Sequence, residues 1–271
     1  MNVIEANGAR IPGIGLGTMT LKASVCVEAV KKALQLGYRH IDTAQNYGNE
    51  REVGEGIRDS GVKRDDVFLT TKVYWNRLNE FERAVDESLK ALGFPTVDLL
   101  LIHWASPQIP VAQSVKTLCS FKRSGVARHV GVANFTTRML DEAVQAATEP
   151  LVTNQIEVHP FLDQTKVIDA CRKHGLSVTA YCPLARGKIP NDDTLERIGA
   201  AHGKSPSQVA LRYLVQQGII PIPRTANPDH LAANLAVFDF ALGDEEMAAI
   251  ARLKRTDGRV VNPPHAPAWD A

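Results

Sequence analysis

Short apolar runs alternate with amphipathic segments along the chain. Eight runs rich in Val, Ile and Leu recur in order, at 13–18, 39–44, 67–73, 97–104, 128–135, 151–158, 176–184 and 219–225. The segments between them, such as 24–37, 78–93 and 136–147, place apolar residues at helical spacing and polar residues on the opposite face. This order predicts alternating strands and helices, with parallel strands buried beneath the helices.

Turn and cap residues mark the ends of these segments. Because glycine adopts the left-handed conformation that ends many helices, we predict helix stops at Gly37, Gly61, Gly93, Gly125, Gly175 and Gly218. Ser205 and Asn227 each precede a proline, which is typical of an N-cap followed by the first helical residue. Asn7 and Gly8 separate two short extended runs and predict a hairpin ahead of the first repeat.

A closed barrel and an open doubly wound sheet both fit eight βα repeats, so the polar residues must distinguish them. One polar or ionisable residue falls at the carboxyl end of each run: Thr18, Asp42, Lys72, His103, Asn134, Gln155, Tyr181 and Arg224. A barrel gathers such groups around one mouth, whereas an open sheet concentrates them at one switch point. We therefore expect residues 1–271 to form one domain, a (β/α)8 TIM barrel with an N-terminal hairpin and extra helices near 190–203 and 243–255.

Composition narrows the classes of partner. The chain has 31 basic and 30 acidic residues, so no broad field attracts nucleic acid or an anionic membrane surface. It has no apolar run of about 18 residues and no signal-peptide pattern. Its four cysteines lie far apart without metal-site spacing. We expect a cytoplasmic protein with reduced thiols, no metal and no membrane contact, and a monomer, because nothing in the sequence requires an oligomer.

Four residues suggest acid chemistry at the predicted mouth. Tyr47 follows Asp42 in a predicted loop, and a phenol is a poor acid unless a nearby cation lowers its pKa. Lys72 supplies a cation, and Asp42 on the adjacent strand is its expected counter-ion. His103, one strand further, is placed to hold an oxygen by a hydrogen bond while neutral. This arrangement predicts that Tyr47 donates a proton to an oxygen that gains negative charge.

Each of these residues also has an ordinary structural interpretation. Taken singly, Asp42 fits a cap, Tyr47 a loop aromatic, Lys72 a strand end and His103 a core histidine. Their joint placement on three consecutive strand ends favours the functional interpretation. A proton donor without a nucleophile or metal cluster implies a nicotinamide cofactor as the source of electrons.

Two stretches are candidates for binding that cofactor. The run "GIGLGT" does not match GxGxxG at a helix start, so we interpret Gly13, Gly15 and Gly17 as packing glycines. Arg224 and Thr225 directly precede the predicted helix start at Asn227, where free N–H groups favour a phosphate. A surface loop with an ordinary cap is the alternative for the second stretch.

These motifs together resemble the aldo-keto reductase superfamily across essentially the whole chain. The resemblance rests on "GLGT", "GYRHIDTAQNYGNEREVG", "FLTTKVYW", "DLLLIHW", "GVANF", "NQIEVHP", "YCPL" and "PIPRTANP", in the family's order. The ending "DGRVVNPPHAPAWD" looks most like the bacterial 2,5-diketo-D-gluconate reductase branch, whose members also reduce methylglyoxal.

The resemblance implies a role for each matching residue. Tyr47 would be the general acid, Asp42 and Lys72 would tune it, and His103 would position the carbonyl. NADPH would be held by Thr18, Asp42, Asn134, Gln155, Tyr181, Pro183, Leu184, Arg224, Thr225, His230 and Asn234. The substrate pocket would be lined by Met19, Tyr74, Trp75, Trp104 and Trp269, with the tail around Trp269 as a candidate lid.

Four residues depart from the family's pattern. Ala133 and Cys182 stand where serines are usual, which puts one carboxamide contact and one pyrophosphate or ribose contact in doubt. Met19 replaces a tryptophan found in many eukaryotic members. His230 replaces an arginine that often grips the 2′-phosphate, and imidazole is a weaker phosphate ligand than guanidinium. We therefore expect a weaker preference for NADPH, with NADH also accepted.

The leading interpretation is a reductase that converts small-molecule aldehydes or ketones to alcohols by hydride transfer. Methylglyoxal, keto sugars and general aldehydes all remain open as substrates. Two other classes are weighed against it. A nicotinamide-binding sensor would lack turnover, and a phosphate-handling lyase or isomerase would act without added nicotinamide.

Overall fold

Parallel strands close into a barrel in the computed structural model, which describes residues 2–270. The sheet runs in the order β10-β9-β8-β7-β6-β5-β4-β3. Its strands are β3 (Leu16–Gly17), β4 (His40–Asp42), β5 (Phe68–Val73), β6 (Val97–Ile102), β7 (Ala127–Ala133), β8 (Leu151–Glu157), β9 (Ser177–Tyr181) and β10 (Ile219–Pro221). Gly15 N donates to Pro221 O (3.0 Å) and Gly17 N to Pro223 O (3.2 Å), which joins the first strand to the last. The predicted barrel is therefore confirmed.

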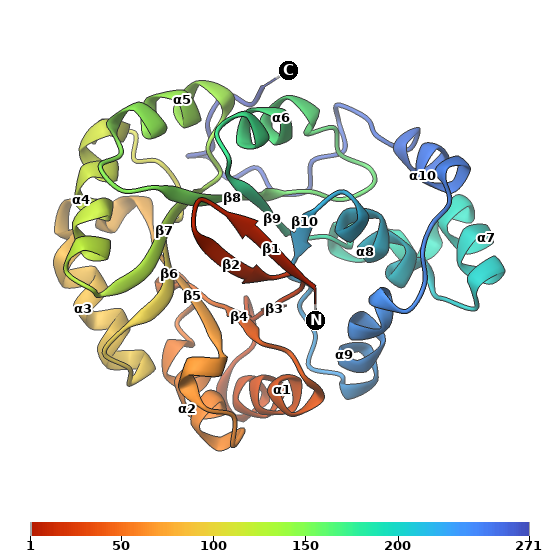
Figure 1. Cartoon of the computed structure of the whole chain (residues 1–271), viewed down its shortest axis with the longest axis horizontal. Helices are drawn as coiled ribbons and strands as arrows, with labels where there is room; N and C mark the ends of the chain where they lie inside the picture. Colours follow the sequence, from red (N-terminus) through yellow and green to blue (C-terminus); the bar gives the residue numbers. More distant parts are fainter. Residues whose placement is uncertain (1, 271) are drawn as a thin grey trace.

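Helices surround the strands on the outside (Figure 1). They are α1 (Ala23–Leu36), α2 (Glu50–Asp59), α3 (Phe81–Leu92), α4 (Val111–Arg123), α5 (Thr137–Ala146), α6 (Thr165–Lys173), α7 (Asp193–His202), α8 (Pro206–Gln216), α9 (Pro228–Leu235) and α10 (Asp244–Ala251). The predicted extra helices correspond to α7 and α10. No helix among residues 2–270 has the length and apolar character needed to span a membrane.

The predicted helix ends are confirmed. All six glycines proposed as stops have positive φ, as at Gly37 with φ 110°. The Ser205 side chain accepts from Gln208 N in a capping box, and Asn227 accepts from Asp229 N. The local sequence thus fixes where these helices start and end.

The N-terminal hairpin closes one end of the barrel. Strands β1 (Val3–Ala6) and β2 (Ala9–Pro12) pair antiparallel around the Asn7–Gly8 turn. Ala9 and Ile11 of β2 belong to one buried cluster with residues of the barrel strands, Leu99, Leu101, Ala133, Val152 and Ile220. Figure 1 shows the hairpin lying across the ring of strands. The carboxyl ends of the strands form the other end, which we call the mouth.

The glycines of the first barrel strand allow close packing, as predicted. A Cβ at Gly15 would lie 2.8 Å from His40 Cγ, and one at Gly17 would lie 2.7 Å from Ile222 O. Real Cβ atoms essentially never approach other heavy atoms this closely, and the buried His40 ring and the Ile222 carbonyl leave little room to move, so these positions need glycine for packing.

Candidate active site

The mouth gathers one polar residue from the end of each barrel strand. Asp42, Lys72, Gln155 and Tyr181 lie within β4, β5, β8 and β9, while Thr18, His103 and Asn134 follow β3, β6 and β7 directly. Arg224 lies three residues beyond β10. The structure therefore brings together the residues that the sequence placed at strand ends.

A buried ion pair forms the base of the mouth. Lys72 Nζ donates to Asp42 Oδ1 (2.6 Å) and to Thr43 O (2.8 Å), and Gln155 Nε2 donates to Asp42 Oδ2 (2.7 Å). Lys72 is 0% exposed. Burial lowers the pKa of Lys72 below its usual value, while the Asp42 carboxylate opposes that shift. The predicted pairing of Asp42 with Lys72 is confirmed, and Gln155 holds the second carboxylate oxygen.

Tyr47 lies over this ion pair. It ends a short 3₁₀ helix, Gln45–Tyr47, that stops at Gly48 in the left-handed conformation. Lys72 Nζ lies 5.1 Å from the centre of the Tyr47 ring. Burial, reinforced by the Asp42 carboxylate, raises the pKa of Tyr47 well above its usual value. Our expectation that Lys72 lowers this pKa is therefore wrong for the protein alone, because desolvation of the phenolate dominates.

His103 stands beside Tyr47 as a neutral imidazole. The two rings meet edge to face with centroids 5.7 Å apart. Burial lowers the pKa of His103 well below its usual value, and Lys72 adds to the shift. Its Nδ1 atom is buried and has no hydrogen-bond partner among residues 2–270. A neutral imidazole next to a protonated phenol can hold an oxygen atom between them by hydrogen bonds.

The residues proposed to face the nicotinamide are linked to one another. Tyr181 Oη donates to Asn134 Oδ1 (2.6 Å), and Asn134 Nδ2 donates to His103 O (3.0 Å). Asn134 has φ 64°, a conformation that asparagine tolerates better than most residues. Thr18 Oγ1 donates to Asp42 O (3.0 Å). These bonds fix Asn134, Tyr181 and Thr18 around the ion pair, whereas Ala133 contributes a buried methyl group.

A second polar segment lies at the start of α9. Arg224 and His230 are exposed, and Thr225 Oγ1 accepts from Asn227 N (3.0 Å). The Thr225 hydroxyl hydrogen therefore stays available. The first turn offers fewer free N–H groups than expected, because Pro228 has none and Asp229 N donates to Asn227 Oδ1 (2.9 Å). Asn234, in contrast, is buried at the far end of α9 beside the Tyr38 phenol.

The segment after β9 packs into the body of the protein. Pro183 is buried and Leu184 half-buried. Cys182 has φ 48°, and burial raises the pKa of its thiol. Its backbone thus adopts an uncommon conformation for a residue that carries a Cβ.

The residues predicted to line the substrate pocket differ in exposure. Trp104 is buried, Tyr74 and Trp75 are half-buried, and Met19 is 41% exposed. The Tyr74 ring meets the His103 ring edge to face at 5.5 Å. These residues, which we call the aromatic wall, therefore begin next to His103.

The C-terminal tail completes the wall through residues that the sequence analysis missed. Glu157 Oε1 and Oε2 accept from Val260 N (2.6 Å) and Val261 N (2.9 Å). Asp270 accepts from Thr137 N (2.9 Å) and Thr137 Oγ1 (2.6 Å). Between these two anchors, Trp269 lies 6.0 Å from Trp104, ring to ring. The tail is therefore held against the mouth.

Two further missed residues belong to the tail. Arg259 stacks on Trp269 at 3.7 Å, and His265 contacts Tyr74, Trp75 and Trp104. Glu157 was one available signal for the tail, because it is an acid within the apolar run 151–158. A buried carboxylate needs hydrogen-bond partners, and here they come from another part of the chain. His265 gave no such signal, since it lies in a segment without periodicity.

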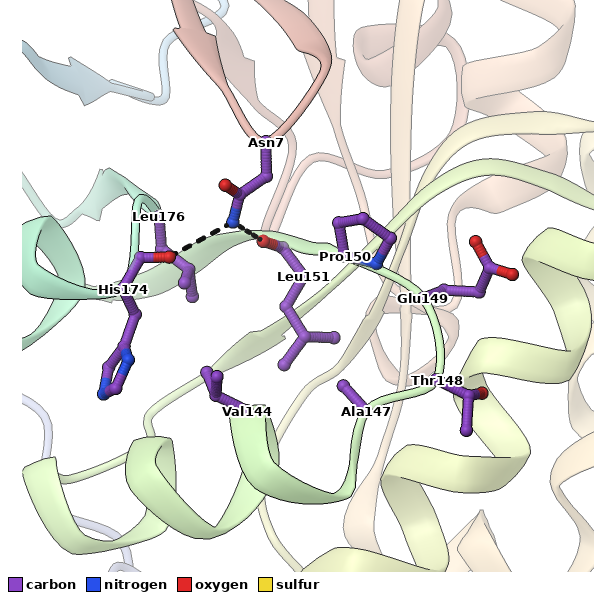
Figure 2. Close-up of a pocket in the computed structure, with 9 residues that line it drawn as sticks. All are labelled: Asn7, Val144, Ala147, Thr148, Glu149, Pro150, Leu151, His174 and Leu176. Carbon is purple, nitrogen blue, oxygen red and sulfur yellow. Dashed lines mark hydrogen bonds between the residues drawn. The ribbon is translucent and has the colours of Figure 1, made fainter.

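Two clefts lie at the hairpin end. The cleft in Figure 2 has a volume of about 300 Å³, and there Asn7 Nδ2 donates to Leu151 O (2.7 Å) and His174 O (3.3 Å). A second cleft of about 380 Å³ is lined by Arg39, Asp98 and Arg128, among others. Neither contains a residue predicted for catalysis. Among residues 2–270, no group of three His, Cys, Asp or Glu side chains is arranged to hold a metal ion.

Comparison with known proteins defines the class of this barrel. The aldo/keto reductase family model matches residues 13–255, and the chain belongs to that family. It is therefore an oxidoreductase that acts on carbonyl compounds.

Three relatives illustrate the similarity. The methylglyoxal reductase DkgB of Salmonella typhimurium is 41% identical over 266 residues, which cover 96% of this chain and 99% of the relative. A crystal structure described as a putative 2,5-diketo-D-gluconic acid reductase B is 48% identical, with a TM-score of 0.98, and the match covers 100% of this chain and 98% of the other. An aldo-keto reductase from Bombyx mori, solved in complex with NADP, is 34% identical with a TM-score of 0.89, covering 96% and 95%.

Proposed function

We propose that this protein reduces small aldehydes and ketones, methylglyoxal among them, with NADPH as cofactor and Tyr47 as general acid. The observation that carries the proposal is the packing of Tyr47 between Lys72 and His103. Lys72 Nζ lies 5.1 Å from the Tyr47 ring centre, and the His103 ring lies 5.7 Å from it. The similarity to a methylglyoxal reductase supports the choice of substrate.

The residues of the mouth have distinct roles in this proposal. NADPH supplies the hydride when it is bound. His103 and Tyr47 hold the carbonyl oxygen and polarise it. The raised pKa keeps Tyr47 protonated at neutral pH, so the phenol has a proton to give. As the carbonyl oxygen becomes an alkoxide, a stronger base than phenolate, it takes that proton from Tyr47 Oη.

Lys72 and Asp42 act on Tyr47 at that step. The phenolate that forms lies next to the Lys72 ammonium, which stabilises the new negative charge. Asp42 fixes the ammonium in place, so little reorganisation is needed when the proton leaves. His103 stays neutral because burial disfavours its charged form.

The residues present fit NADPH. A flat phenol at Tyr181 and two amides, Asn134 and Gln155, suit a nicotinamide ring and its carboxamide. Thr18, Asp42, Pro183 and Leu184 would flank the ribose and pyrophosphate. The Arg224 guanidinium and the Thr225 hydroxyl, at the start of α9, suit a 2′-phosphate. His230 lies on the exposed side of the same turn, and Asn234 would border the adenine.

The test is the loss of NADPH absorbance with methylglyoxal, small aldehydes and keto sugars, with NADH in parallel. We expect turnover with NADPH and slower turnover with NADH. NADPH binding without turnover of any carbonyl would favour a sensor, and activity without added nicotinamide would favour a lyase or isomerase. Either result would contradict the proposal.

A further inference from the structure

The tail places a second histidine at the substrate pocket. His265 is half-buried, and its Nε2 lies 3.0 Å from Tyr74 Oη, at hydrogen-bond distance. Its ring meets the rings of Tyr74 at 5.3 Å, Trp104 at 5.1 Å and Trp75 at 5.4 Å. His265 is therefore held on three sides by the aromatic wall, and the mechanism above gives it no role.

Tyr74 connects this histidine to the groups that hold the reacting oxygen. Its ring contacts His103 edge to face at 5.5 Å and 78°, and it contacts His265 at 5.3 Å and 77°. His103 in turn contacts Tyr47. The pair formed by Tyr74 and His265 thus lies one ring away from the site of the carbonyl oxygen, about where the next substituent of a small substrate would lie.

The pair always keeps one hydrogen available for a ligand. Burial lowers the pKa of His265 and raises that of Tyr74, so both are neutral at pH 7. Together they carry one ring N–H and one O–H, and their mutual bond uses one of these. If Tyr74 donates, His265 Nδ1–H stays available, and if His265 Nε2–H donates, the Tyr74 hydroxyl stays available.

We propose that Tyr74 and His265 form a second polar subsite, which binds an oxygen atom on the carbon next to the reacting carbonyl. The two residues would then determine specificity for α-oxygenated carbonyls over simple aldehydes. This inference rests on the proposed carbonyl reductase function. The aromatic rings shield the half-buried pair from water in part, so its hydrogen bond to a substrate oxygen discriminates more strongly than one at an open surface.

The test compares methylglyoxal with propanal, which has the same carbon chain but lacks the second oxygen. The kcat/KM ratio for the two substrates is measured for the wild type, His265→Leu and His265→Gln, with NADPH affinity followed by fluorescence. We expect His265→Leu to lower the ratio roughly tenfold, mainly through KM for methylglyoxal, because the remaining Tyr74 hydroxyl loses the partner that orients it. His265→Gln should stay within about twofold of the wild type, because an amide both donates and accepts.

Controls separate a lost hydrogen bond from a disturbed fold. Tyr74→Phe should lower the ratio as His265→Leu does, and His174→Leu, at the hairpin end, should leave it unchanged. Hydration of the aldehydes cancels because each variant is compared with the wild type on the same substrate. An unchanged ratio in His265→Leu, or an equal fall in the Leu and Gln variants, would overturn the subsite. A wild type that turns over neither substrate would overturn the proposed function and this inference together.

Discussion

The two ends of the barrel both contain buried acids paired with cations, but they expose those cations differently. At the hairpin end, Asp98 pairs with Arg64 at 2.7 Å and Arg128 at 3.0 Å, and the Arg128 side chain is 47% exposed. At the mouth, Asp42 pairs with Lys72, which is fully buried. Water solvates the arginines in part, whereas Lys72 depends on its protein partners alone.

This difference separates a stabilising network from a reactive one. Burying an ammonium costs on the order of several kcal/mol, even when the ammonium is paired with an acid. The hairpin end avoids much of that cost because its guanidinium groups reach the surface. The mouth keeps a fully buried cation beside Tyr47, where the proposed mechanism forms a phenolate. We infer that the costly arrangement is retained for chemistry, and four predictions test this contrast in order of expected effect.

Removing the buried cation at the mouth should largely abolish activity and also destabilise the fold. We expect Lys72→Met to lower kcat by roughly a hundredfold or more, because the developing phenolate loses its cation. It should also lower the free energy of unfolding by about 3 to 5 kcal/mol, because Asp42 stays buried without its ion-pair partner. Adding Asp42→Asn should recover part of the stability but none of the activity. Recovery of both in the double variant would contradict the proposed role of Lys72.

His40 lies between the two networks and should make stability sensitive to acid. Its ring bonds Thr70 Oγ1 (3.1 Å), and burial lowers its pKa from 6.5 to about 4. The unfolded chain therefore takes up the proton first as pH falls. The contribution of neutral His40 to the free energy of unfolding is complete above pH 6.5 and is lost as the pH falls from 6.5 to 4, a loss of about 3 kcal/mol. The lowered pKa of His103 acts in the same direction.

Urea denaturation between pH 7 and pH 4 measures this loss. His40→Asn should have a flatter pH dependence than the wild type, whatever its stability at pH 7. His230→Asn, which replaces an exposed histidine of α9, is the matched control and should keep the wild-type slope. Equal slopes in all three proteins would show that His40 does not carry the effect.

Neutralising the buried acid at the hairpin end should destabilise the protein without affecting catalysis. In Asp98→Asn, Arg64 and Arg128 lose a charged acceptor, and the bond from Leu69 N to Asp98 Oδ2 (2.9 Å) is weakened. We expect a loss of about 2 kcal/mol in the free energy of unfolding, with kcat within about twofold of the wild type. A large fall in kcat of the fully folded Asp98→Asn variant would mean that the two ends are coupled.

The smallest expected effect concerns cofactor choice at the edge of the mouth. We expect His230→Arg to raise the preference for NADPH over NADH roughly fivefold, because a guanidinium binds phosphate better than an imidazole. The ratio of kcat/KM for the two cofactors measures the change, with His230→Gln as the neutral control. A wild type that already prefers NADPH by more than about a thousandfold would remove the basis for this prediction.

The sequence was sufficient for the barrel and the strand-end residues, because both follow from local periodicity. A polar residue after an apolar run must reach the same end of a parallel sheet, so Asp42 and Lys72 could be paired from the sequence. The tail could not be placed in this way. His265 meets Tyr74 across 191 positions, and Val260 meets Glu157 across 103, with no periodic pattern to bring them together.

The direction of the pKa shift at Tyr47 was also beyond the sequence. Spacing indicated a cation near the phenol, and the structure places one there. The balance between that cation and desolvation depends on how closely the walls pack around Tyr47. It therefore emerges only from the three-dimensional structure.

The most direct test of the central claim is a paired measurement on Tyr47→Phe. This change removes the acidic hydroxyl and keeps the ring that Lys72 and His103 contact. We expect methylglyoxal reduction to fall by at least about a hundredfold, while NADPH affinity stays within a few fold of the wild type. Reduction at the wild-type rate would contradict the role of Tyr47 as the proton donor.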